Sequence, residues 1–322
     1  MREYDLIDKY LRPLTKNHPA SLDLRDDAAI ITPRTNCQLV ATKDCIVENV
    51  HFLTSTSPEN IAKKLVGVNL SDIAAMGAKP LYGMISATLS DRIDEHWIQN
   101  FCSTLSRLNN KYNICLIGGD TTKYSEGPLV LSMTMIGEVD KYKAIRQDGA
   151  HPGDNVYVTG NIGDAAIGLE VAKGNFSDLD RATKVYFEQK YNAPEPQVDL
   201  GQKLNNSATS MTDISDGFVS DLEKIATHSN VSIEINQNLI PFSTQLKKLM
   251  SKHDLLEKVL TGGDDYELVF TAPKIFDSQI FAIANSVDTK VTRIGTVISG
   301  KGIKIIDADG NKLNFIQPGY EH

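Results

Sequence analysis

Aspartates stand at the ends of apolar segments at six places along this chain, each next to glycine, serine or threonine. The six places are Asp26–Asp27, Asp44, Asp72, Asp120, Asp213 with Asp216, and Asp264–Asp265. An ionised carboxylate beside apolar chain is costly unless it is paired or bound to a metal. Since these segments hold few lysines or arginines, we expect a fold in which the acids meet divalent cations, and all-oxygen ligands favour Mg²⁺.

Ordinary structural roles are the alternative for each acid taken singly. Asp216 can cap the helix that follows it, Asp72 can cap a neighbouring loop, and Asp307–Gly310 reads as a hairpin turn only. Caps accept serine, threonine and asparagine as readily as aspartate. An acid at every junction therefore favours cation binding for the set.

Several Mg²⁺ ions held by carboxylates usually indicate phosphate chemistry. The chain carries a net charge of -8, so a polyphosphate would be held through cations, and nucleic acid and anionic membranes are poor partners. Gly118–Gly119 before Asp120 would let backbone approach a nucleotide, and Gly160–Gly163 opens a helix whose N-terminus favours anions. The P-loop, dinucleotide-binding and protein-kinase patterns are absent from the sequence.

Hydrophobic periodicity, with a polar stretch rich in glycine and proline at the boundary, predicts two domains, residues 1–145 and 146–322. The first is predicted to be an α/β domain with a mixed sheet, and the second an α+β domain. The first domain is predicted to include a strand over 28–31 and a helix from Ser57 to Gly77. The second is predicted to end in a hairpin of strands 303–306 and 312–315.

The charged N-terminal stretch resembles no secretory signal, and no apolar run is long enough to span a membrane. The four cysteines form no C-x-x-C pair, which predicts buried, reduced thiols. We therefore expect a cytoplasmic protein.

Seven segments, in order along nearly the whole chain, resemble those of the thiamine-monophosphate kinase family, in the superfamily of aminoimidazole-ribonucleotide synthetase. They are Asp26–Ala29, Thr42–Phe52, Asn69–Pro80, Gly118–Thr122, Asp213–Gly217, Gly262–Leu268 and Gly319–His322. His51–Phe52 and the Gly-Tyr-x-His terminus favour this branch over its relatives.

The resemblance implies phosphorylation of thiamine phosphate to thiamine diphosphate by in-line transfer of the γ-phosphoryl group of ATP. It implies a two-domain aminoimidazole-ribonucleotide-synthetase-like fold that dimerises through the N-terminal sheet. The implied metal ligands are Asp27, Thr42, Lys43, Asp44, Asp72, Asp120, Asp213 and Asp216, of which Asp44, Asp120 and Asp213 would be catalytic. The implied nucleotide contacts are Gly119, Asp120, Arg146 and Ser215, and those to thiamine phosphate are His51, Asp264 and Tyr320.

Three residues depart from the family pattern. Lys43 replaces a hydroxyl residue: a metal that uses the backbone carbonyl there is unaffected, whereas a metal that uses the side chain loses one ligand. Asp264 replaces a glutamate and is one methylene shorter, and Cys102 stands near the place where the family carries an aromatic beside the adenine. Two alternatives stay open: a superfamily enzyme with another acceptor, of the ligase, cyclase or selenophosphate synthetase kind, or a non-catalytic protein that binds Mg-nucleotide.

Overall fold

The computed structural model describes residues 3–320, which divide into two compact units. The changeover along the chain falls between Tyr142 and Lys143, and the short segment Ala74–Gly77 groups with the second unit. The terminal Glu321–His322 of the last matching segment lies outside the described residues.

The first unit is built on a four-stranded mixed sheet in the order β1-β4-β2-β3. The strands are β1 (Cys37–Val47), β2 (Lys79–Ser90), β3 (Cys115–Tyr124) and β4 (Val130–Asp140). β2 and β3 run parallel, while β4 is antiparallel to both of its neighbours. The prediction of a mixed sheet is confirmed.

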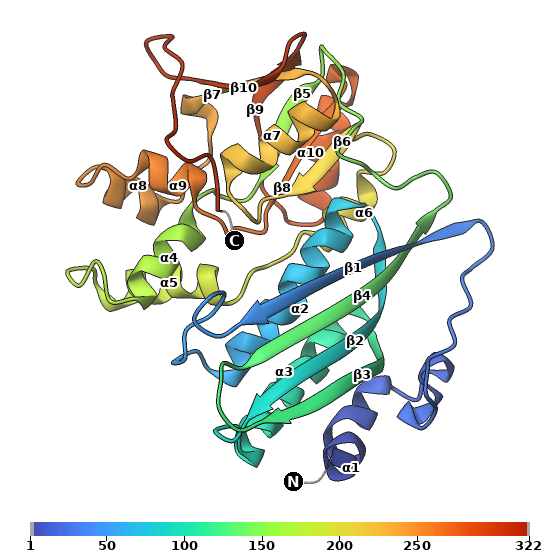
Figure 1. Cartoon of the computed structure of the whole chain (residues 1–322). Helices are drawn as coiled ribbons and strands as arrows, with labels where there is room; N and C mark the ends of the chain where they lie inside the picture. The colour runs from blue at the N-terminus through green and yellow to red at the C-terminus, as the bar shows by residue number, and fades with distance from the viewer. Residues whose placement is uncertain (1–2, 321–322) are drawn as a thin grey trace. The chain divides into compact units, whose positions relative to one another are not determined.

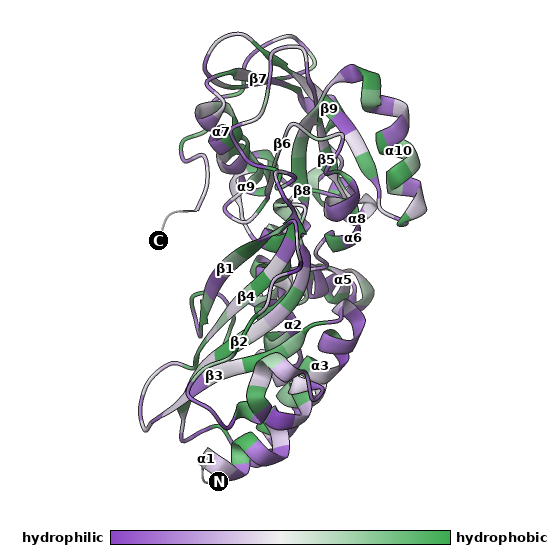
Figure 2. Ribbon diagram, turned by 90° about the vertical axis from the view of Figure 1, so that its right-hand side faces the viewer, coloured by the Kyte–Doolittle hydropathy of each residue, from purple (hydrophilic) through white to green (hydrophobic). Residues whose placement is uncertain are grey.

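Two long helices, α2 (Pro58–Ala75) and α3 (Glu95–Tyr112), cover one face of this sheet, as Figures 1 and 2 show. The predicted helix that begins at Ser57–Pro58 is confirmed as α2. Asp94 caps α3 by accepting the N–H of Trp97 at 2.7 Å, and Asn113 ends it in a left-handed conformation. In β4, buried and half-buried residues alternate, as expected of a strand with one face against helices.

The N-terminal segment forms short helical turns instead of one helix: α1 (Glu3–Leu6), a π-helical turn (Ile7–Leu11) and two 3₁₀ turns (Arg12–Thr15, Pro19–Leu24). Residues 28–31 pair with no strand, so the prediction there is wrong. Ala29 and Ile31 nevertheless pack against the buried cluster of Ala20, Cys115 and Ile117. Their apolar side chains thus pack on residues of β3, although their backbone forms no strand.

The second unit is α+β, with a six-stranded sheet in the order β10-β7-β9-β5-β8-β6. Its strands are β5 (Asn155–Thr159), β6 (Ser210–Asp213), β7 (Ser232–Asn236), β8 (Leu268–Ala272), β9 (Val291–Ile298) and β10 (Gly302–Ile306). Its helices are α4 (Asp164–Ala172), α5 (Arg181–Asn192), α6 (Val198–Lys203), α7 (Phe218–His228), α8 (Thr244–Met250), α9 (Leu256–Thr261) and α10 (Asp277–Ser286). Figure 2 shows α7 and α10 on opposite sides of this sheet.

The predicted terminal hairpin is wrong in its second strand. Asp307 does form the expected turn, with its carboxylate accepting the N–H groups of Asp309 and Asn311. Beyond the turn Lys312 bridges to Ile306, and the N–H of Leu313 donates to the carbonyl of Ile305 at 2.8 Å, but residues 312–315 form no strand. The hairpin signal thus holds for the turn and its first bridge.

Gly168 in α4 tests the packing of α4 on α5. A methyl group there would stand 2.1 Å from the carbonyl oxygen of Phe187. We expect Gly168→Ala to lower the free energy of unfolding by about 1–3 kcal/mol through overpacking. Helix propensity alone predicts that the free energy of unfolding rises by up to about 1 kcal/mol. The sign of the change, measured by urea unfolding, therefore decides whether overpacking or helix propensity dominates.

Candidate active site

The predicted site residues fall into three groups, two in the first unit and one in the second. Within residues 3–320, no three histidine, cysteine, aspartate or glutamate side chains gather closely enough to form a metal site on their own. The convergence of all the predicted ligands on one centre therefore stays a prediction. Each group has a defined local geometry.

The first group lies between β1 and α2. Thr42 donates its hydroxyl hydrogen bond to the carboxylate of Asp72, and the N–H of Asp44 meets the side-chain oxygen of Asn69 at 3.3 Å. Asp72 therefore faces a strand hydroxyl. Thr42 and Asp44 are two residues apart on one strand, so both side chains project from the same face.

Lys43 projects from the opposite face of β1 and is exposed. A metal held between β1 and α2 could use only its backbone carbonyl. Asp120 also lies on that opposite face, because strand pairing aligns it with Ser86, Ser132 and Cys45. The sheet thus separates Asp120 from Asp44.

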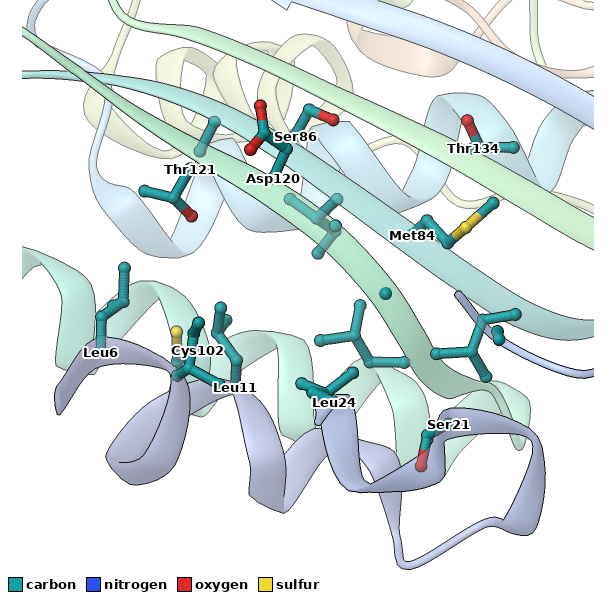
Figure 3. Close-up of a pocket in the computed structure, with 18 of the residues that line it drawn as sticks. Leu6, Leu11, Ser21, Leu24, Met84, Ser86, Cys102, Asp120, Thr121 and Thr134 are labelled. Carbon is teal, nitrogen blue, oxygen red and sulfur yellow. The ribbon is translucent and has the colours of Figure 1, made fainter. Parts of the chain in front are cut away.

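The second group lines a cavity of about 630 Å³ in the first unit. Figure 3 shows Asp120 and Ser86 side by side on β3 and β2, with Leu6 and Leu11 of the N-terminal turns on the far side. Asp26, Asp27, Gly119 and Thr121 line it as well. The lining therefore combines carboxylates and hydroxyl groups with apolar side chains.

Cys102 lines the same cavity, and burial raises the pKa of its thiol to about 12. It is therefore a neutral wall and not a reactive group. Trp97 and Phe101, whose stacked rings lie 5.0 Å apart, line the cavity beside it. Sequence reasoning singled out neither aromatic, although both lie on the apolar face of α3 at helical spacing. Cys102 and Cys115 are buried as expected, but Cys45 is exposed, and all four thiols are free.

Gly119 also has a structural role, beside the nucleotide contact that stays a prediction. A side chain there would stand 2.1 Å from the carbonyl oxygen of Ile85, so glycine is needed for β3 to lie against β2. Glycine at this position lets β3 pair closely with β2, and this pairing places Gly119 in the cavity wall.

The third group lies in the second unit, where three segments distant in sequence touch. The N–H of Asp264 donates to the carbonyl of Ser215 at 2.9 Å, and the N–H of Tyr320 donates to the carbonyl of Asp216 at 2.8 Å. Asp264 adopts a left-handed conformation, with φ +72°. The structure thus brings predicted metal and nucleotide residues beside predicted substrate residues.

Asp216 does not cap α7, since Gly217 is the N-cap residue and no side chain caps it. Its carboxylate instead meets Lys224 at 2.7 Å. Burial acts against the charge of Lys224, but Asp221 and Asp216 outweigh it and raise its pKa. Asp213 ends β6 and is buried.

Arg146 is anchored by its backbone beside β6, where its carbonyl accepts the N–H of Met211. Its guanidinium pairs with Asp148 through two hydrogen bonds and is mostly exposed. An incoming anion would find Arg146 accessible, in competition with Asp148.

The predicted anion site at the start of α4 is wrong. The N–H groups of Gly163 and Ala165 already donate to the carboxylate of Asp265, at 2.7 and 3.2 Å. An internal carboxylate occupies the place an external anion would take.

His51 is held by the turn that follows β1. Its Nδ1 accepts the N–H of Val47 at 3.1 Å, which leaves Nε2 to carry the proton of the neutral ring. Glu48, buried in the same turn, accepts two hydrogen bonds from Arg92 and one from the N–H of Leu129. This clamp ties the His51 turn to the end of β2.

Comparisons with known proteins agree with this architecture. The family model "AIR synthase related protein, N-terminal domain" matches residues 25–139, and the corresponding C-terminal model matches residues 151–308. Thiamine-monophosphate kinase of Haemophilus influenzae is 37% identical over 100% of this chain and 98% of that protein, and the Escherichia coli K12 enzyme is 35% identical over 99% and 98%.

Solved structures of thiamine-monophosphate kinases also match this chain. Thiamine-monophosphate kinase of Stenotrophomonas maltophilia matches with a TM-score of 0.86 at 37% identity, covering 97% of this chain and 98% of that one. AaThiL in complex with AMPPCP and TMP matches with a TM-score of 0.78 at 30% identity, covering 100% and 99%.

The Glu48–Arg92 clamp generates a pH-dependent prediction. The Arg92 hydrogen bonds hold the pKa of Glu48 at about 2, below its ordinary value of 4.5. Because the folded-state pKa is depressed, the stabilisation is complete above about pH 4.5 and is lost as the pH falls toward 2. We expect Arg92→Met to lower the free energy of unfolding by about 1–2 kcal/mol at pH 6, and by less at pH 3.5.

Lys123→Met is the matched control, since it removes the exposed neighbouring pair of Lys123 with Asp91. We expect a change below about 0.5 kcal/mol at both pH values. An Arg92→Met effect that is equal at the two pH values would contradict the assignment of the clamp.

Proposed function

Because the chain belongs to the thiamine-monophosphate kinase family of AIR synthase related proteins, we propose that it phosphorylates thiamine phosphate with ATP, giving thiamine diphosphate and ADP. The observation that carries the proposal is the meeting of Ser215, Asp216, Asp264 and Tyr320 on three touching segments. Groups expected to hold nucleotide and metal there adjoin groups expected to hold the acceptor.

The cavity of the first unit is proposed as the nucleotide site. Its volume is in the range of ordinary small-molecule pockets, about 300–1,000 Å³. Leu6, Leu11 and Phe101 offer apolar contact for a base, and Asp27 and Asp120 of the same lining offer carboxylates for the cations that would accompany the phosphates. The stacked pair of Trp97 and Phe101 compensates for the missing aromatic at Cys102.

The donor set fits magnesium. The proposed ligands offer carboxylate oxygens and the Thr42 hydroxyl, and the hydrogen bond between Thr42 and Asp72 shows that two such oxygens can stand together. The residues that would hold the ions are Asp27, Thr42, the Lys43 carbonyl, Asp44, Asp72, Asp120, Asp213 and Asp216. Bound Mg²⁺ would neutralise the phosphate oxygens and thus reduce the repulsion between two anionic reactants.

The protein's own groups act by positioning. A phosphate acceptor is already anionic near neutral pH, so no general base is needed, and catalysis depends on alignment and charge. His51 can donate from Nε2 to an acceptor oxygen while Val47 fixes its ring. Tyr320, with its side chain half exposed and its backbone tied to Asp216, can stack on a cationic ring, for about 0.5–2 kcal/mol.

A homodimer and a cytoplasmic location complete the proposal. In the proposed dimer a second copy would cover the face of the first sheet that lies opposite α2 and α3, where Leu39 of β1 is exposed. No helix of residues 3–320 is both long enough and apolar enough to cross a bilayer. Sedimentation analysis giving a monomer at micromolar concentration would contradict the dimer.

An assay with product identification tests the proposed reaction. We expect thiamine diphosphate and ADP in equal amounts from thiamine phosphate and ATP, and only with Mg²⁺ present. ADP release with another acceptor would instead favour another enzyme of the superfamily. Mg-ATP binding without turnover on any acceptor would favour a non-catalytic role.

Asp44→Asn tests the β1–α2 group. We expect turnover to fall by about 100-fold or more, because the amide loses the charge that a cation needs, while thermal unfolding stays unchanged. Asp91→Asn is the control, since Asp91 is an exposed acid of the same unit that pairs with Lys123. Wild-type turnover in Asp44→Asn would remove Asp44 from the site.

A further inference from the structure

Asp221 is a fully buried carboxylate in the first turn of α7. Its Oδ2 accepts the N–H groups of Ser215, Asp216 and Gly217, at 3.0, 3.0 and 3.2 Å. Three consecutive amides of the turn therefore converge on one carboxylate oxygen.

Converging backbone N–H groups ahead of a helix ordinarily attract an external anion such as phosphate. Here Asp221 takes that place from within. The turn consequently offers an arriving ligand its carboxylates and the Ser215 side chain, and its amides are already satisfied.

Lys224 lies one helical turn further along and joins two acids. Its Nζ meets Asp221 Oδ1 at 2.6 Å and Asp216 Oδ2 at 2.7 Å. The ammonium group thus holds Asp216 in place, and it also occupies a carboxylate oxygen that a metal would use.

We infer that Asp221 and Lys224 are positioning residues that set the cation affinity of the Ser215–Gly217 turn, Asp221 by excluding anions from the amides and Lys224 by competing with the metal for Asp216. The inference rests on the proposed function only in taking Asp216 as a cation ligand. The two residues act in opposite directions, so their removal must give opposite changes.

Binding of Mn²⁺ to the full chain without nucleotide, followed by electron paramagnetic resonance, tests this. We expect Asp221→Asn to weaken Mn²⁺ binding by about tenfold or more, the usual effect of removing an outer-shell partner. Equilibrium dialysis should show a gain in binding of inorganic phosphate by the same variant, since its amides face a neutral group.

Lys224→Met should strengthen Mn²⁺ binding by about two- to fivefold, because it removes a half-exposed competitor. Lys224→Arg keeps the charge and should stay near wild type. In an Asp216→Asn background the effect of Lys224→Met should vanish, which a merely structural role of Lys224 would not produce.

Glu223→Gln is the matched control, since it removes an exposed charge from the same helix and should leave Mn²⁺ binding unchanged. Equal or weaker binding in Lys224→Met overturns the inference, even if Asp221→Asn fails to fold. If the variants change Mn²⁺ affinity in the expected directions but the wild-type protein has no kinase turnover, the proposed reaction is wrong and this inference holds. If the wild-type protein has kinase turnover but the variants leave Mn²⁺ affinity unchanged, this inference is wrong and the proposed reaction holds.

Discussion

A carboxylate withdrawn from water must find donors, and this requirement shapes the loops of the molecule. Asp221 takes three amides and an ammonium group, Asp265 takes two amides at the start of α4, and Glu48 takes Arg92 and the N–H of Leu129. Each bond set fixes a turn that carries a proposed functional residue: Ser215, Asp264 and His51. Rigid turns of this kind hold reacting groups in register at no further entropic cost when a ligand arrives.

The same requirement separates the acids with structural partners from those proposed to bind cations. Burial raises the pKa of Asp265, and it raises that of Glu267 to about 7, with hydrogen bonds from amides or from Thr159 opposing the rise. Their donors all come from within the fold. Asp27 and Asp120, by contrast, lie exposed at the cavity, where a cation can reach them. An acid at the end of an apolar segment is thus an ambiguous signal until its partners are known.

Residue pattern predicted the parts of the fold that depend on local chemistry. The start of α2, the mixed sheet and the Asp307 turn follow from caps, periodicity and turn residues. The contact of Asp264 with Ser215 joins two motifs that the sequence identified. The sequence could not predict that these two motifs touch, because they lie far apart along the chain. Asp221 was missed because an acid within an amphipathic helix reads as a solvated face. The cavity was missed because Leu6 and Leu11 meet Phe101 across some ninety residues of chain.

Filled amide clusters explain why an acidic chain of this fold has no P-loop. A P-loop binds phosphate with free backbone amides and a lysine. In the second unit Asp221 and Asp265 take up the amides at the starts of two helices, and Lys224 is held by two carboxylates. Direct phosphate binding at these helix starts is thereby disfavoured. Under the proposed function, a triphosphate would bind only with its metal ions, and the metal would then take part in substrate selection as well as in charge neutralisation.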